Sequence, residues 1–164
     1  MGGGNVSPMI LERLSREPYR LTMRRGSARI GTVPDAVQVG PKVCLINKYS
    51  ASDGDLFPWG FRALGLGKLI GTRTWGGIVG ISGSLPYMDG TDIRVPFFTS
   101  FDPKTGSWII ENHGVDPDIL IDNDPVKEWN GEDQQLDRAI QEVMKELQDR
   151  KPLPGVPTPR DFSK

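Results

Sequence analysis

The chain has 164 residues, which is long enough for one domain with a sizeable core and too short to argue for two. Hydrophobic residues make up 37% and charged residues 25%, an ordinary globular composition. The formal net charge of −1 gives no electrostatic case for binding nucleic acid or an anionic membrane.

Cysteine usage and hydropathy exclude further classes. The single cysteine, Cys44, rules out an internal disulfide and a multi-cysteine zinc site, and its place in the apolar run VCLI predicts a buried, inert thiol. No stretch approaches the ~20 apolar residues of a membrane helix, and no basic-then-apolar signal opens the chain. We expect a cytoplasmic protein that needs no metal and no cofactor.

The first elements are short. Apolar residues recur at helical spacing after Ser7, which predicts a helix with Ser7 as its N-cap and Pro8 as its first residue, ended by Pro18. Residues 20–40 mix arginines with Gly and Pro without a stable period, and we expect a loop that holds at most one short strand.

A strand, a helix and a second strand follow. The apolar, β-branched run KVCLINKY (42–49) predicts a strand buried on both faces, as in a parallel sheet. Helical periodicity then begins close to Asp53 and stops at Gly65. The run KLIGTRTW (68–75) predicts the next strand.

The second half changes character. Residues 78–88 and 91–101 flank the turn signal Asp89-Gly90, and the segment SWIIEN (107–112) follows another turn, so we expect a β-meander. A last helix is expected from Asn130 as N-cap, with Asp133 in its first turn and one apolar face made by Leu136, Ile140, Val143, Met144 and Leu147.

The stretch KYSASDGDLFPWG (48–60) holds the candidate chemistry. Ser52 ends a buried strand immediately before a helix, so its hydroxyl projects from a rigid edge and the free helix N–H groups point at whatever bonds to it. The N–H of Asp53 is placed to donate to an oxyanion. Two alternatives remain open: Ser50, Ser52 and the acids merely cap the helix, or Asp53-Gly54-Asp55 begins a calcium loop, although the other ligand positions are lacking.

This stretch, with GLGKLIGTRTWGG after it, resembles the serine peptidases that include the C-terminal-processing (tail-specific) proteases and the tricorn proteases, and looks closest to the tricorn group. The family's Ser-Ala-Ser-Ala-Ser-Glu signature places the nucleophile on Ser52, and the Asp-Gly-Asp that follows matches the tricorn pattern. The likeness runs from GGGNVS to ENHGVDPDI and the final helix.

The resemblance also implies the rest of a catalytic set. Processing proteases use a lysine as base, but Gly77 stands at the matching position. Tricorn proteases use a histidine, a second serine and a glutamate, and the glutamate role falls on Glu111. The histidine and serine belong to an upstream domain that nothing here matches. His113, the only histidine, is a weaker candidate for the base, and its cluster with acids matches no compact metal motif.

The N-terminal glycines and the region near Leu21 complete the resemblance. Gly4 or its neighbour Gly3 is expected to supply the second oxyanion-hole N–H, since glycine lets the backbone approach a substrate carbonyl. A phosphate loop is the alternative for this GGG segment, but no strand precedes it and no Gly-Lys-Ser/Thr follows. The segment 21–24 lacks the acid that favours basic substrates in tricorn proteases, so that preference is not carried over.

The resemblance predicts the α/β sandwich of Clp-protease-like and crotonase-like proteins, with a strand-helix-strand core, a β-meander and a C-terminal helix. Residues 1–150 are expected to form the C-terminal catalytic domain of a longer peptidase, inactive alone, and 151–164 a proline-rich tail. The expected partners are peptide substrates, upstream catalytic and PDZ-like domains, and further copies in a homo-oligomer. The alternatives are a crotonase-like acyl-CoA enzyme and a non-catalytic interaction module of the same fold.

Overall fold

A computed structural model describes residues 3–159, with the side chains of residues 82–85 excepted, and confirms a mixed α/β fold. Residues 1–2 and 160–164, at the ends of the two expected ranges, lie outside the described residues. The elements are α1 (Ser7–Leu14), β1 (Arg20–Met23), β2 (Ile30–Val33), β3 (Val43–Ile46), α2 (Asp53–Ala63), β4 (Lys68–Gly71), β5 (Gly80–Pro86), β6 (Asp92–Phe98), β7 (Ile119–Leu120), α3 (Pro125–Trp129) and α4 (Gln134–Asp149).

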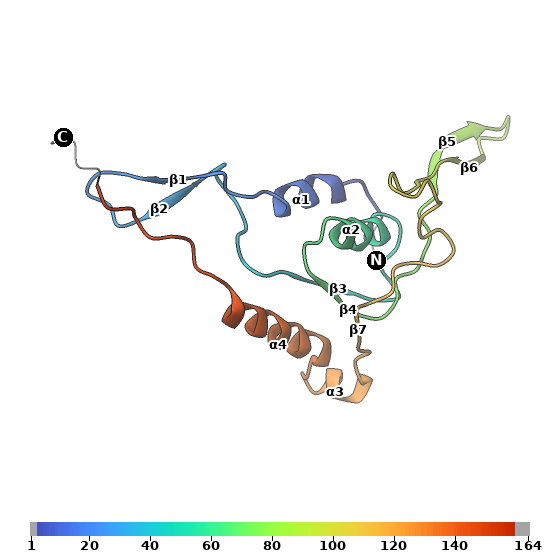
Figure 1. The fold of residues 1–164 in the computed structure, drawn as a ribbon. Helices are drawn as coiled ribbons and strands as arrows, with labels where there is room; N and C mark the ends of the chain where they lie inside the picture. The colour runs from blue at the N-terminus through green and yellow to red at the C-terminus, as the bar shows by residue number, and fades with distance from the viewer. Residues whose placement is uncertain (1–2, 160–164) are drawn as a thin grey trace.

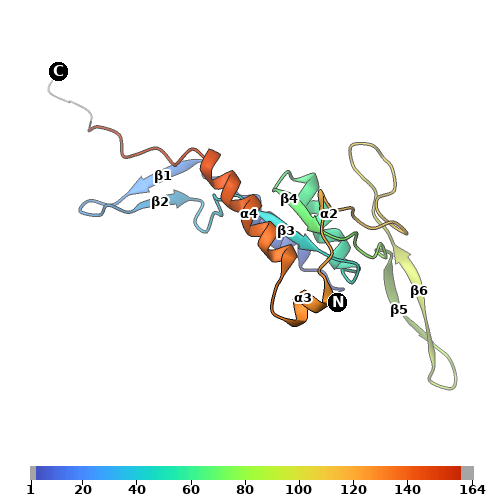
Figure 2. The same cartoon turned by 90° about the horizontal axis from the view of Figure 1, so that it is seen from below.

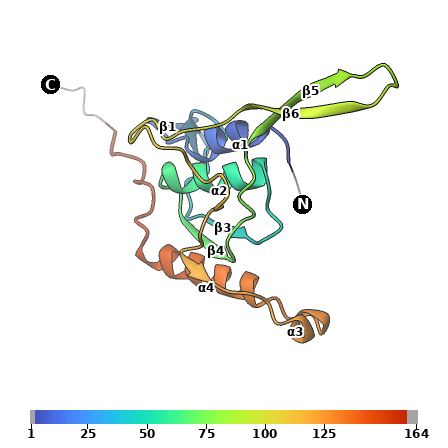
Figure 3. The same ribbon diagram turned by 90° about the vertical axis from the view of Figure 1, so that its right-hand side faces the viewer.

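The centre of the molecule is a parallel sheet with helices on both faces. Its strands run in the order β3-β4-β7, with Cys44 opposite Leu69 and Ile70 opposite Ile119. Helices α1 and α2 pack together on one face, and α4 covers the other (Figure 1, Figure 3). The expected strand-helix-strand unit is thus confirmed as β3, α2 and β4.

The core lies between α2 and this sheet. Phe61 of α2 and Leu69 of β4 are almost fully buried. Burial raises the pKa of the Cys44 thiol to about 11, which agrees with the expected inert cysteine. The expectation of a strand over residues 42–49 that is buried on both faces is only partly correct. Strand β3 covers Val43–Ile46, Leu45 is 42% exposed, and residues 47–49 lie exposed beyond the strand.

The start of α1 differs from the sequence expectation by one residue. Val6, not Ser7, occupies the N-cap position, and Ser7 is the first helical residue. The Ser7 hydroxyl is buried and donates to the carboxylate of Asp53 instead of accepting from its own helix. A tertiary partner has therefore replaced the local cap.

Helix α4 also begins later than expected. Asp133 is its N-cap and accepts the N–H of Leu136 at 2.9 Å, whereas Asn130 ends the short helix α3. The face of α4 that meets the sheet is largely polar: the Gln135 amide donates to the carbonyls of Ile46 and Ile70 at 2.8 and 2.7 Å. The apolar face points away from the sheet, and its exposed members are Leu136, Ile140, Met144 and Leu147.

An ion-pair cluster clasps α4 to β4 and makes stability depend on pH. Lys68 and Arg138 each approach a Glu142 oxygen at 2.6 Å. The hydrogen bond from Lys68, followed by that from Arg138, holds the pKa of Glu142 below its ordinary value of 4.5. A carboxylate with a lowered pKa stabilises the folded state above the unfolded pKa, and this contribution is lost as the pH falls through the folded value.

Glu142→Gln is therefore expected to lower the urea midpoint of unfolding at about pH 7 and to lower it less at an acid pH below the folded pKa of Glu142, where the wild-type carboxyl is protonated. Tryptophan fluorescence during urea titration measures both midpoints. Glu17→Gln, at an exposed position, is the matched control and should change neither. Equal losses for Glu142→Gln at both pH values would contradict the account.

Two hairpins extend from opposite sides of the core (Figure 2). The first, β1 and β2, forms where a loop was expected. The second, β5 and β6, confirms the hairpin predicted around Asp89-Gly90. The meander's third strand at 107–112 is not formed: only an isolated bridge joins Trp108 to Phe101, and Asn112, at φ 60°, bends the chain into a turn.

The tail beyond α4 lies beside the first hairpin (Figure 1). The side chains of Pro154 and Val156 share a cavity of about 340 Å³ with Leu21 and Ile30, so the described part of the tail lies against the first hairpin. Among the described residues, none of the helices combines the length and the apolar character needed to cross a membrane.

Candidate active site

Ser52 sits in a sharp turn between β3 and α2. Its φ of 57° and ψ of −116° lie in a region that residues other than glycine rarely adopt. Two hydrogen bonds hold this conformation: the Ser52 N–H is 3.1 Å from the carbonyl of Gly77 and 2.9 Å from Oδ2 of Asp55. The backbone thus holds the half-buried Ser52 at the free N-terminus of a helix, as a nucleophile elbow does.

Asp55 is the main support of this turn, and it is a role that sequence reasoning missed. The residue is fully buried, and its carboxylate also accepts the N–H groups of Gly76 at 2.8 Å and Gly77 at 3.2 Å. An acid three residues after a serine N-cap is the sequence signal of a capping box, which would have suggested the bond back to Ser52. Nothing local signals the bonds to residues 76–77.

Glu111 is anchored to the continuation of the same segment. Its Oε2 accepts the N–H groups of Ile78 at 2.7 Å and Val79 at 3.0 Å. None of the described residues donates a hydrogen bond to its other oxygen, Oε1. Ser52 and Glu111 are 59 positions apart in the sequence, yet both form hydrogen bonds with the backbone of residues 76–79.

The N-terminal glycines lie against the serine. A Cβ built on Gly3 would lie 3.4 Å from Oγ of Ser52, and one built on Gly4 would lie 3.8 Å from Oδ2 of Asp53. Gly4 has a φ of 158°, a backbone conformation that residues other than glycine rarely adopt. A groove of about 390 Å³ is lined by Gly3, Gly54 and Leu45, among others. The structure thus brings Gly3, Gly4, Ser52 and Asp53 together.

The carboxylates of Asp53 and Asp55 are both occupied. Asp53 accepts N–H groups from Val6 and Ser7, and Asp55 accepts those of residues 52, 76 and 77. This pattern disfavours the calcium loop, because the acids already have N–H partners. It also departs from simple helix capping, because most of those donors come from outside α2.

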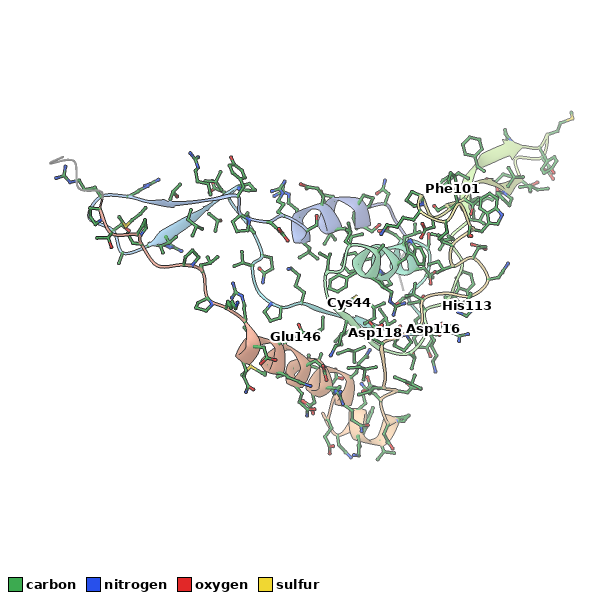
Figure 4. The ribbon with its side chains drawn as sticks, viewed as in Figure 1. Cys44, Phe101, His113, Asp116, Asp118 and Glu146 are labelled. Atoms are coloured by element: carbon green, nitrogen blue, oxygen red, sulfur yellow. The ribbon has the colours of Figure 1, made fainter. Side chains whose placement is uncertain are left out.

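His113 belongs to a different cluster. Its Nε2 lies 2.9 Å from Oδ2 of Asp116 (Figure 4). The other oxygen of Asp116, Oδ1, pairs with Nε of Arg73 at 2.6 Å. The hydrogen bond with His113 and then that from Arg73 hold the pKa of Asp116 below its ordinary value. Asp118, the next acid, pairs with Arg62 at 2.8 Å. These carboxylates are engaged by cations, which weakens the case for a metal site.

The position expected for a lysine base is closed to side chains. A Cβ on Gly77 would overlap the indole ring of Trp75, so a lysine there would require that ring to move. Ser50, the other serine of the cluster, has a different role: its Oγ accepts the N–H of Asn47 at 3.4 Å, within the turn that ends β3. Ser52 is the one whose Oγ meets the glycines.

A strained serine between a parallel strand and a helix, with glycine backbone against its hydroxyl, is typical of serine-hydrolase sites. The model of peptidase family S41 matches residues 2–121, and the chain belongs to this family. It is therefore a domain of a serine-type peptidase family.

Individual relatives narrow the placement within the family. The tricorn protease of Thermoplasma volcanium is 43% identical over 150 residues, which covers 90% of this chain and 14% of that protein. A crystal structure of the tricorn protease superimposes with a TM-score of 0.81 at 40% identity, again covering 90% of this chain and 14% of that one. The photosystem II D1 C-terminal processing protease shares the fold, with a TM-score of 0.50 at 23% identity over 73% of this chain and 32% of its own.

Proposed function

We propose that this chain is the nucleophile-bearing catalytic domain of a tricorn-like serine endopeptidase, in which Ser52 attacks the peptide carbonyl. One observation carries the proposal: the hydroxyl of Ser52 meets the Gly3 backbone on one side, while its own backbone is fixed to the segment that also holds Glu111. This arrangement supports the role of Ser52 as nucleophile, of the Asp53 and Gly3 or Gly4 N–H groups as oxyanion donors, and of Glu111 as a supporting acid.

The chemistry follows that of acyl transfer. A base takes the proton of the Ser52 hydroxyl as its oxygen bonds to the carbonyl carbon, and the carbonyl oxygen becomes an oxyanion. The N–H of Asp53 and that of Gly3 or Gly4 donate to this oxyanion. The leaving amine takes up the proton from the base, and water then releases the acyl group from Ser52 by the same route.

The base and its orienting serine are proposed to lie on an upstream domain. The chain's one histidine, His113, is engaged with Asp116. Oε1 of Glu111, to which none of the described residues donates, is the acceptor we assign to the incoming serine. The chain spans 14% of the length of the tricorn relative. We propose an upstream catalytic domain, a PDZ-like domain and a homo-oligomer as its partners, with peptides as substrates. Strand β1, which covers residues 21–23, carries no acid to select basic side chains.

The test compares two proteins on fluorogenic peptides. The full-length protein is expected to hydrolyse them and to lose this activity to a fluorophosphonate, whereas this 164-residue chain alone is expected to show none above buffer because the base is missing. His113→Ala is the matched variant and should leave full-length activity unchanged. Hydrolysis by the chain alone, abolished by His113→Ala, would overturn the assignment of the base to another domain.

A further inference from the structure

We propose that the carboxylate of Asp53 is a positioning group that joins the two halves of the oxyanion hole. The backbone N–H of Asp53 is one of the proposed donors, and its side chain anchors the segment that carries the other, at Gly3 or Gly4. The inference rests on the proposed function, and it assigns to this side chain a task separate from that of its backbone.

The anchoring bonds span distant parts of the sequence. Oδ2 of Asp53 accepts the N–H groups of Val6 and Ser7, each at 3.1 Å, and Oδ1 accepts the Ser7 hydroxyl. The donors precede Asp53 by 47 and 46 residues. Asp53 is 8% exposed and Ser7 is 4% exposed, so water cannot readily replace either partner.

Val6 lies only two residues beyond Gly4, so these bonds fix the end of the glycine segment. Glycines have wide backbone freedom, and an unanchored Gly3-Gly4 pair would sample many conformations. An oxyanion hole works only when its donors are already in place as charge develops. The carboxylate of Asp53 supplies this restraint from the residue whose own N–H faces the same oxyanion.

The two acids of the Asp-Gly-Asp motif divide the work. Asp55 points to residues 76–77 and fixes the nucleophile's backbone, whereas Asp53 points to the start of α1. The positive end of the α1 dipole favours a carboxylate at this place. An amide keeps one oxygen as the acceptor for the N–H groups of Val6 and Ser7, but it loses the charge and turns an NH2 donor toward the Ser7 hydroxyl, which can then accept. Asn is therefore the conservative variant at position 53.

The test measures kcat and KM for peptide hydrolysis by the full-length protein. Asp53→Ala is expected to lower kcat roughly 100-fold with KM within about 3-fold, because loss of an ordered oxyanion donor weakens transition-state binding more than substrate binding. Asp53→Asn is expected to recover at least about a tenth of the wild-type kcat. Hydrogen exchange at the Val6 and Ser7 amides should quicken in Asp53→Ala only.

Asp124→Ala is the matched control, because Asp124 also accepts two backbone N–H groups at a helix start, those of Val126 and Lys127. It should leave kcat unchanged. The inference would be overturned by a wild-type kcat in folded Asp53→Ala or by an equal fall of kcat in Asp124→Ala. A change in KM with no change in kcat would overturn it as well. Loss of kcat in both Asp53 variants with wild-type amide protection would also do so. Activity retained in Ser52→Ala would reject the proposed function, and this inference with it. Activity retained in Asp53→Ala but lost in Ser52→Ala would reject this inference alone.

Discussion

Ser52→Ala is expected to lower kcat of the full-length protein by roughly 10⁴- to 10⁶-fold, the usual result of removing a serine nucleophile. The substitution removes one oxygen atom and keeps the backbone bonds to Gly77 and Asp55. Folding and substrate affinity should therefore change little. Steady-state hydrolysis of a peptide substrate measures the effect, with circular dichroism to confirm the fold.

The matched control is Ser50→Ala, two residues earlier in the same cluster. It removes a long hydrogen bond of 3.4 Å from the Asn47 N–H and is expected to leave kcat within about 3-fold of the wild type. If Ser52→Ala kept more than about a tenth of the activity, or if Ser50→Ala lost it, Ser52 would not be the nucleophile.

Asp55→Ala is expected to produce the largest loss of stability of any single substitution in the turn, about 3 to 5 kcal/mol in the free energy of unfolding. The change would leave the N–H groups of Ser52, Gly76 and Gly77 without the buried acceptor that they share. Since domains are stable by only about 5–15 kcal/mol, the variant should be marginal at room temperature. Urea unfolding of this chain measures the loss.

Asp102→Ala provides the comparison. Its Oδ1 also accepts two backbone N–H groups, from Lys104 at 2.6 Å and Thr105 at 3.2 Å, but in an exposed turn where water can take its place. The expected loss is below about 1 kcal/mol. Similar losses for Asp55→Ala and Asp102→Ala would show that the buried acid does not hold the nucleophile turn together.

Local signals account for the parts of the fold that the sequence predicted correctly. The strand at 43–46 within the run 42–49, the start of α2 at Asp53 and its stop at Gly65 depend on hydrophobic period, capping and a left-handed glycine, all readable within a few residues. Asp89-Gly90 marked its hairpin in the same way. One local signal was overlooked: Asp124-Pro125 has the N-cap and first-position proline of α3.

Long-range contacts account for most of the differences. Ser7 left its expected capping role because Asp53, 46 residues away, binds its hydroxyl. Residues 107–112 have a strand composition, but the Asn112 N–H donates to the carbonyl of Gly76, and this bond turns the chain instead of extending it. In both contacts the two partners lie too far apart in the sequence for any local pattern to include them together.

The candidate site divides in the same way. Composition placed Ser52 at a helix start, and family resemblance singled it out along with Glu111. The geometry then added the roles of the two acids beside it, which neither composition nor resemblance indicated. In helix α4 the apolar periodicity predicted the helix correctly but not the face that packs. The polar face of the helix meets the sheet, through Gln135 and Glu142.

Mapping the covalent adduct of a fluorophosphonate on the full-length protein tests the central claim most directly. After labelling, proteolysis and tandem mass spectrometry, the account predicts one adduct, on Ser52, that is absent from Ser52→Ala and retained in Ser50→Ala. An adduct on Ser50 or on a serine outside this chain, with Ser52 unmodified in an inactivated enzyme, would contradict it.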